Sequence, residues 1–369
     1  MSSSQRIVIK LGTSTLTAGG KNISAPTLVD LIRQMASLQV ENVQIVMVSS
    51  GAIAAGRQEL GFPDLPKHLP AKQMLAAVGQ PRLMAMYEQY FAIYNICVAQ
   101  VLLTRNDLTD RRGYLNARNT LEALISNHIV PIVNENDTVA TEEIRFGDND
   151  HLSAQVANLI EADQLFLLTD QDGLYSSDPR TDSKAKLIRE VGSDAITPEL
   201  WHAAGGTNNG LGTGGMITKL HAADLARHGG TVVKIARGTE ADVLLKLFRG
   251  EKIGTTVLPT VNTLEGRKRY ILSGSRISAE VEIDAGAVKA LNRGGSLLPA
   301  GILKANGEFE RGDTVNIVTH DGRIVAVGLI NYGSVEIGKI CGAQSGEIET
   351  RLGYTFGDEA VHRNNMILM

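Results

Sequence analysis

Two lysines stand beside glycine-rich turns, where free backbone N–H groups can hold a phosphate. Lys219 ends the segment GLGTGGMITK (210–219), and Lys10 directly precedes a turn that contains Gly12. The first segment is not a Rossmann turn, because no apolar run precedes it. It is not a P-loop either, because three residues separate its last glycine from the lysine. The sequence predicts that both ammonium groups meet the same phosphates.

Short polar side chains follow other apolar runs, and parallel strands would bring such residues to one edge of a sheet. Ser50, Gly51 and Ala52 open a helix after one run. The free N–H groups of a helix start suit a carboxylate or a phosphate, although a serine is also an ordinary N-cap. Asp137 follows another buried run, where an ammonium group on a substrate would satisfy its charge.

Two further segments add polar groups to this predicted edge. FGDNDHLSA places Asp148, Asn149 and Asp150 at the start of a helix, which is more than one cap requires. Thr169 and Asp170 follow the apolar run LFLLT, at a position where an adenine or a ribose could be held. These residues alone do not determine which of the two groups they hold.

The lysines and the lack of an obvious general base indicate the chemistry. An alcohol acceptor would need a base, such as a catalytic aspartate, to take its proton. A carboxylate has a pKa of about 4.3, so it is ionised at pH 7 and can attack a phosphoryl group unaided. Lysines, helix N-termini and Mg²⁺ then supply alignment and charge neutralisation. The sequence therefore favours formation of an acyl phosphate.

Short apolar runs alternate with amphipathic segments of helix length, and this pattern predicts an α/β domain. The strands and helices of that domain must position the residues described above. Most of the runs are continuously apolar, as buried parallel strands are. The expected strands are 6–10, 43–49, 96–103, 129–134, 165–169 and 231–236. The expected helices are 27–40, 51–60, 72–94, 114–127, 150–161 and 215–228. We expect an open, mainly parallel sheet sandwiched by helices.

A different pattern begins near residue 276. The segments AEVEID, GDTVNIVTHDGRIVAVGLINY and GEI are short expected strands with Gly or Asp-Gly turns between them. They predict a second, small β-rich domain. We place the two domains at 1–257 and 276–357, with a linker at 258–275 and a C-terminal tail at 358–369.

The composition favours a soluble protein of two or three domains. The 369 residues are 43% apolar, yet no run approaches the roughly 18 apolar residues of a membrane span. A net charge of −4 argues against bulk attraction to nucleic acid or to an anionic membrane. The two distant cysteines indicate neither a disulfide framework nor a Cys-rich zinc site, and there is no signal-peptide core. We expect a cytoplasmic protein.

In this order, the motifs resemble the amino acid kinase family. The resemblance rests on IVIKLGTS, VSSGAIAAG, VNENDTVAT, FGDNDHLSA, LLTDQDGLYSSDPR and GLGTGGMITKLHAA, and it covers nearly the whole chain. RGGSLLPAGI and FERGDTVNI are similar to a PUA domain. The resemblance implies that ATP phosphorylates the γ-carboxylate of L-glutamate. The product would be γ-glutamyl phosphate, formed in the first step of proline biosynthesis.

The same resemblance implies the role of each residue. Lys10 and Lys219 would neutralise the transferring phosphoryl group, oriented by Asp150 or, alternatively, by Asp148. Glutamate would be held by Ser50, Gly51, Ala52, Asp137 and Asn149. ATP would be bound by Lys10, Thr169, Asp170, Thr213, Gly214, Gly215, Met216, Ile217, Thr218 and Lys219. Mg²⁺ would be carried mainly by the phosphates, so no metal site on the protein is expected.

Further ligands and partners are implied by the resemblance alone. L-proline would inhibit by feedback at or near the glutamate pocket. Glutamyl phosphate reductase would use the labile product. The chain would form a homo-oligomer, a dimer or a tetramer, through its kinase domain.

Two other interpretations remain open. Within the same fold the acceptor could be aspartate, acetylglutamate, carbamate or UMP, although the phosphate of UMP would call for more Arg or Lys. A PUA domain could instead bind RNA. However, residues 276–369 contain nine Lys and Arg against twelve Asp and Glu, a net charge of −3, which opposes binding to phosphates. We therefore expect no nucleic acid and no membrane as a partner.

Overall fold

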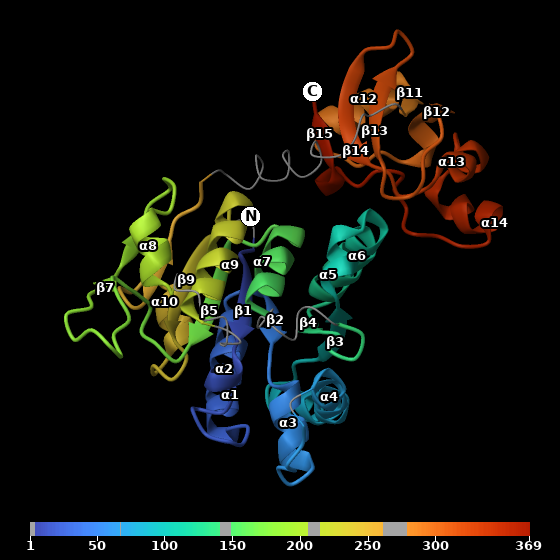
Figure 1. The fold of residues 1–369 in the computed structure, drawn as a ribbon. Coiled ribbons are helices and arrows are strands. Elements are labelled where there is room, and N and C mark those ends of the chain that lie inside the picture. Colours follow the sequence, from blue (N-terminus) through green and yellow to red (C-terminus); the bar gives the residue numbers. More distant parts are fainter. Residues whose placement is uncertain (1–3, 67, 141–148, 206–214, 261–278) are drawn as a thin grey trace. The chain divides into compact units, whose positions relative to one another are not determined.

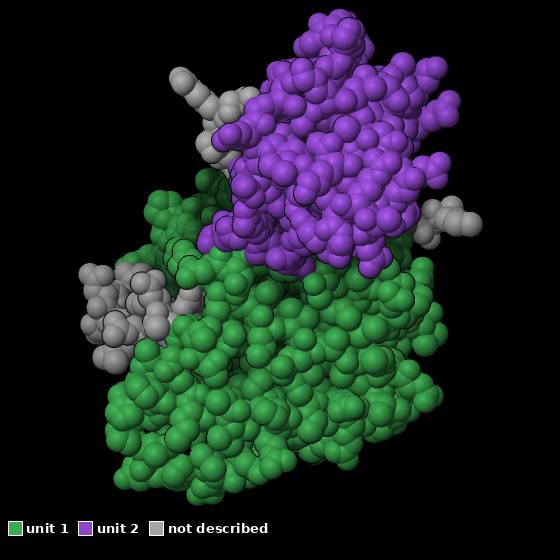
Figure 2. All heavy atoms as spheres, turned by 90° about the vertical axis from the view of Figure 1, so that its right-hand side faces the viewer, with its two compact units in different colours: residues 1–108, 117–263 green, residues 109–116, 264–369 purple. Residues whose placement is uncertain are grey.

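The computed structural model describes residues 4–66, 68–140, 149–205, 215–260 and 279–369. The chain divides into two compact units, which Figure 2 shows in two colours. Unit 1 comprises residues 1–108 and 117–263, and unit 2 comprises residues 109–116 and 264–369. Among the described residues, no helix combines the length and the apolar character needed to cross a bilayer.

An eight-stranded sheet forms the framework of unit 1 (Figure 1), in the order β3-β4-β2-β1-β5-β9-β10-β8. Its strands are β1 (Arg6–Leu11), β2 (Gln44–Ser49), β3 (Val98–Leu103), β4 (Val130–Glu135), β5 (Gln164–Thr169), β8 (Glu190–Val191), β9 (Val232–Arg237) and β10 (Thr255–Val257). Neighbours from β3 to β9 in this order are parallel, and β10 is antiparallel to β9. All the strands expected from the apolar runs are present.

Helices pack on both faces of this sheet. The expected helices are α2 (Ala25–Val40), α3 (Ala52–Glu59), α4 (Leu69–Ala92), α6 (Arg111–Ser126), α7 (Asn149–Leu159) and α9 (Met216–His228). Side chains alternate along β1, so that Ile7 and Ile9 share a core with α2, α4 and α10 (Val243–Phe248), whereas Lys10 faces α7. The predicted mainly parallel sheet between helices is therefore confirmed.

Several short elements of unit 1 were not predicted. They are α1 (Thr13–Leu16), α5 (Arg105–Thr109), α8 (Pro198–Ala203), α10, the strands β8 and β10, and the hairpin of β6 (Leu174–Tyr175) with β7 (Leu187–Ile188). The helices among them have four to six residues, which is too short for a periodic apolar pattern.

Helices α3 and α4 lie side by side (Figure 1) and cross at very close range through two glycines. A Cβ on Gly56 would lie 1.9 Å from the carbonyl oxygen of Leu75, and one on Gly79 would lie 1.8 Å from that of Ala52. No side chain fits at either position. The crossing therefore fixes Ala52, the first residue of α3, against α4.

Unit 2 contains a five-stranded sheet in the order β12-β11-β13-β14-β15. Its strands are β11 (Glu280–Ile283), β12 (Ile302–Asn306), β13 (Thr314–Thr319), β14 (Ile324–Leu329) and β15 (Met366–Leu368), and its helices are α12 (Ala285–Asn292), α13 (Ser334–Ile340) and α14 (Ile348–Leu352). The predicted β-rich second domain is confirmed. Residues 358–369, which we described as a tail, include β15, and β15 pairs with β14.

The strand expected at GEI is wrong. Ser345–Glu347 form a 3₁₀ helix that leads into α14. The carboxylate of Glu347 accepts a hydrogen bond from the N–H of Gln344 at 3.1 Å. Such a cap stabilises the start of a helix, and it is not visible in an isolated Gly-Glu-Ile triplet.

Candidate active site

A cavity of about 620 Å³ lies at the carboxyl edge of the main sheet, where β1, β2, β4 and β5 end. This volume is typical of sites for small ligands. Eight of the predicted site residues line it: Lys10, Ser50, Gly51, Ala52, Asp137, Asn149, Asp170 and Lys219. Residues that are remote in sequence therefore share one cavity.

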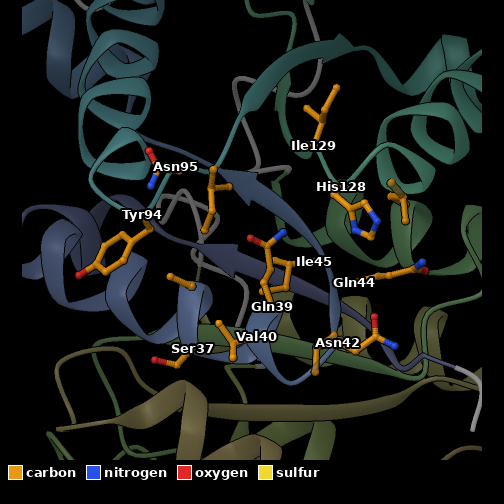
Figure 3. A pocket seen from close by; sticks show the side chains of 14 residues that line it. Ser37, Gln39, Val40, Asn42, Gln44, Ile45, Tyr94, Asn95, His128 and Ile129 are labelled. Carbon is orange, nitrogen blue, oxygen red and sulfur yellow. The ribbon is translucent and has the colours of Figure 1, made fainter.

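A second cavity of about 460 Å³ lies near the amino ends of β2 and β4, and Figure 3 shows its lining side chains. Fourteen described residues line it, and none of them is Asp, Glu, Lys or Arg. This second cavity has no lysine or arginine to neutralise a phosphoryl group. The cavity at the carboxyl edge is therefore the candidate active site.

Three buried charged side chains meet in the candidate active site. Nζ of Lys10 lies 2.6 Å from Oδ1 of Asp150, and Nζ of Lys219 lies 3.2 Å from Oδ2 of Asp150. None of the three residues is more than 5% exposed. The structure thus brings Lys10 of β1 and Lys219 of α9 together on one carboxylate. Asp148, the alternative acid, lies outside the described residues.

The opposite charges of this cluster favour the ionised form of Asp150. Burial opposes the ionisation of Asp150, but the two lysines outweigh it and lower the pKa of Asp150 to about 2. Burial lowers the pKa of Lys10, Asp150 acts in the opposite direction, and the nearby Lys219 lowers it further. The hydroxyl of Thr218 also donates to Asp150 at 2.7 Å. Two ammonium groups around one carboxylate leave one positive charge, which suits an anionic ligand.

The turn after β2 is built to bring backbone N–H groups to the cavity. Gly51 has a φ of 103°, in the region that favours glycine, and a Cβ there would lie 2.8 Å from Cδ1 of Leu16. Gly51, and not Ser50, is the N-cap of α3, so the alternative of an ordinary serine cap is wrong. The hydroxyl of Ser50 instead accepts a hydrogen bond from Nδ2 of Asn149 at 3.1 Å.

Asp137 is a carboxylate in the same cavity. It forms no hydrogen bond or ion pair with any residue that the structure describes. Burial raises the pKa of Asp137 to about 6. A cationic group of a ligand would favour the ionised form, because an opposite charge close to a carboxylate lowers its pKa.

The predicted nucleotide residues surround the other side of the lysine cluster. Thr169, buried at the end of β5, donates to Oδ1 of the exposed Asp170 at 3.0 Å. Gly215 is the N-cap of α9, and Met216, Ile217 and Thr218 form its first turn, where backbone N–H groups lack helical partners. Thr213 and Gly214 lie outside the described residues.

Asn134 and Gln80 were missed as site residues. Asn134 is 1% exposed at the end of β4, and its Oδ1 accepts from Asn149 at 3.0 Å. Its place in the polar cluster after an apolar run was a usable signal. Gln80 lies in the middle of α4 and contacts Asn134 at 2.8 Å, and nothing in the spacing of the sequence indicates this contact.

Comparison with known proteins agrees with the fold. Residues 5–237 match the model of the amino acid kinase family, and residues 279–352 match that of the PUA domain. The chain therefore belongs to the amino acid kinase family.

Within that family the chain is similar to glutamate 5-kinases along its full length. The glutamate 5-kinase of Shewanella oneidensis is 51% identical over 366 residues, covering 99% of this chain and 98% of the relative. That of Herpetosiphon aurantiacus is 50% identical over 363 residues, covering 98% of each chain. That of Vibrio campbellii is 48% identical over 370 residues, covering 100% of this chain and 97% of the relative.

Proposed function

We propose that this protein transfers the γ-phosphoryl group of ATP to the γ-carboxylate of L-glutamate. The products are γ-glutamyl phosphate and ADP, and the reaction is the first step of proline biosynthesis. The observation that carries the proposal is the buried cluster of Lys10, Asp150 and Lys219 in one cavity with Asp137, which has no partner among the described residues. The relatives named glutamate 5-kinase, 48% to 51% identical, point to the same reaction.

The acceptor side of the site recognises an amino acid through groups of opposite charge. Asp137 accepts the ammonium group, and the positive charge of that group opposes the burial that raises the pKa of Asp137. Ser50 and the free N–H groups in the first turn of α3 donate to carboxylate oxygens. The γ-carboxylate then points to the lysine cluster.

Phosphoryl transfer in this site needs no general base. The γ-carboxylate is ionised at neutral pH and carries no proton to remove. Asp150 is held by both lysines and has a pKa of about 2, so it does not act as a base. Lys10 and Lys219 neutralise the charge on the phosphoryl oxygens as it shifts between the leaving and attacking oxygens. Asp150 keeps the two lysines in place.

The nucleotide lies against the end of β5 and the start of α9. Thr169, Asp170 and residues 215–219 form this side of the site in the described part of the chain, and the first turn of α9 presents free N–H groups to the phosphates. Mg²⁺, when bound with ATP, neutralises further phosphate charge. We place Mg²⁺ on the phosphates of ATP.

Three further expectations belong to the same proposal. L-proline carries an ammonium and a carboxylate like the acceptor, so it inhibits at or near the pocket of Asp137. Glutamyl phosphate reductase takes up the product, because an acyl phosphate hydrolyses readily. The chain forms a homo-oligomer through unit 1, and it acts in the cytoplasm.

The reaction is tested by incubating the protein with ATP, Mg²⁺ and each candidate acceptor. Hydroxylamine traps an acyl phosphate from glutamate, aspartate or acetylglutamate as a hydroxamate, and ADP release reports transfer to carbamate or UMP. We expect a signal with glutamate. Absence of that signal, together with turnover of another acceptor, would show that the proposed substrate is wrong.

A further inference from the structure

A chain of side-chain amides runs from the edge strand β3 to the acceptor side of the cavity. Nε2 of Gln80 donates to Oε1 of Gln100 at 3.0 Å, and Nδ2 of Asn134 donates to Oε1 of Gln80 at 2.8 Å. Nδ2 of Asn149 donates to Oδ1 of Asn134 at 3.0 Å and to the hydroxyl of Ser50 at 3.1 Å. Residues of β3, α4, β4 and α7 are joined in this way.

The backbone fixes the direction of this amide chain. The N–H of Glu135 lies 2.9 Å from Oδ1 of Asn134, and because an N–H only donates, the atom that it meets must be an oxygen. The NH₂ group of Asn134 must then face Gln80, which presents its own oxygen. For the same reason Asn149 must turn its NH₂ group toward Asn134. None of these amides can be turned over without losing a hydrogen bond.

The chain leaves one acceptor unused at its inner end. Oδ1 of Asn149 is buried and has no hydrogen-bond donor among the described residues. Asp137, which lines the same cavity, is likewise unpaired within the described part of the chain. A buried acceptor without a donor costs about 1–3 kcal/mol. The buried oxygen of Asn149 and the half-buried carboxylate of Asp137 together suit a group with several N–H donors, and an ammonium has three.

Gln80 lies behind the cavity rather than in its lining. It follows Gly79, whose contact with the carbonyl of Ala52 fixes this part of α4 against α3. The amide of Gln80 therefore has a fixed support and meets Asn134 in a buried setting. If its oxygen were removed, the NH₂ group of Asn134 would lose its partner. Only the N–H of Glu135 would then hold the amide that orients Asn149.

We propose that Gln80 is a positioning residue that sets the specificity for an acceptor with an ammonium group. Through Asn134 it keeps the oxygen of Asn149, and not the NH₂ group, turned toward that ammonium. A reversed Asn149 would place two N–H donors against the N–H donors of the ligand. This inference rests on the proposed function, because it concerns how that same site recognises its acceptor.

The test compares L-glutamate with glutarate, which has the same two carboxylates and no ammonium group. In the full-length protein, Gln80→Leu removes the acceptor for Asn134 at similar side-chain volume. We expect KM for glutamate to rise about tenfold, in line with loss of one hydrogen bond to a charged group. KM for ATP and the inhibition constant of glutarate against glutamate should not change. The preference for glutamate over glutarate thus falls about tenfold.

Two matched variants separate positioning from general damage. Gln80→Glu keeps an oxygen for Asn134, and the exposed Gln100 can turn its NH₂ group toward the new carboxylate, so the preference for glutamate should be retained. Gln100→Leu changes only the outer end of the chain and should leave the preference intact. Thermal unfolding checks that each variant folds, and Gln80→Met replaces Gln80→Leu if the latter does not.

The outcomes distinguish this inference from the proposed function. An equal loss of affinity for glutamate and glutarate in Gln80→Leu, or an unchanged preference, would overturn the role of Gln80. A wild-type protein that does not phosphorylate glutamate would instead overturn the proposed function. In the first case the wild type remains active on glutamate, so the two failures cannot be confused.

Discussion

The carboxylate of Asp150 lies 2.6 Å from the ammonium group of Lys10, and neither residue is more than 4% exposed. A buried ion pair of this kind holds its partners in place only while both charges are present. Because the pKa of Asp150 is about 2, its charge persists throughout the pH range in which enzymes are assayed. Changes in activity near neutral pH must therefore come from other groups.

Replacement of Asp150 by asparagine tests the orienting carboxylate. Asp150→Asn keeps the shape of the side chain but leaves Lys10 and Lys219 as two buried cations that repel each other. We expect kcat to fall about a hundredfold or more, measured by ADP release at saturating ATP and glutamate. Asp163→Asn, at an exposed acid before β5, is the control. Full activity of Asp150→Asn would contradict the role of this carboxylate.

Replacement of Lys10 or Lys219 tests whether their ammonium groups neutralise the charge of the transferring phosphoryl group. Lys10→Ala and Lys219→Ala should each lower kcat by about a hundredfold or more, because a donor to the transferring group is lost. The exposed Lys184 provides a control, since Lys184→Ala changes the net charge equally without touching the cavity. Near-normal turnover in both active-site variants would exclude the proposed mechanism.

Asp137, which we propose binds the ammonium group of glutamate, should affect substrate binding rather than turnover. Asp137→Ala is expected to raise KM for glutamate roughly 10- to 100-fold, with kcat and KM for ATP nearly unchanged. The reason is that the ammonium contact exists in both the ground state and the transition state. Initial rates over a grid of glutamate and ATP concentrations measure both constants. A fall in kcat at unchanged KM would assign Asp137 a different role.

Asp137 also predicts a pH dependence. Burial raises its pKa to about 6, above the usual value, so in the free enzyme the carboxyl is protonated below that pH and ionised above it. Only the ionised form attracts an ammonium group. KM for glutamate should therefore rise as pH falls below about 6, by roughly tenfold per pH unit. Asp137→Asn should show a high KM without this dependence, and a flat profile in the wild type would refute the assignment.

The crossing of α3 and α4 predicts a stability effect. In Gly79→Ala the new methyl group meets the carbonyl of Ala52 at 1.8 Å, so the helices must separate. We expect a loss of about 3 kcal/mol or more in the free energy of unfolding, seen as a lower Tm. At Gly192 a Cβ meets nothing within 4 Å, and Gly192→Ala should stay within about 0.5 kcal/mol of the wild type.

Much of unit 1 was predictable, because buried parallel strands produce continuous apolar runs of the right length. β5 (Gln164–Thr169) is such a run, and it differs from the expected 165–169 by one residue. The antiparallel β10 has three residues and no such run, so it was missed. The strand expected at GEI failed because the cap formed by Glu347 decides that segment.

The site residues that follow strands could be predicted from the sequence. Gln80 could not, because it lies in the helix α4 and contacts the site residue Asn134 from outside the cavity. Ser50, Asp137 and Asp170 come directly or shortly after apolar runs, and parallel topology brings all such positions to one edge. Gln80 lies in mid-helix, and its partner Asn134 is remote in the chain. The periodicity of the local sequence does not indicate the contact between Gln80 and Asn134, because that contact depends on how α4 packs against the sheet.

In the free protein, the surplus positive charge of the Lys10–Asp150–Lys219 cluster favours small inorganic anions as well as ATP. Dissolved sulfate or inorganic phosphate can bind there, in competition with the nucleotide. The affinity for ATP therefore depends on the anions of the medium.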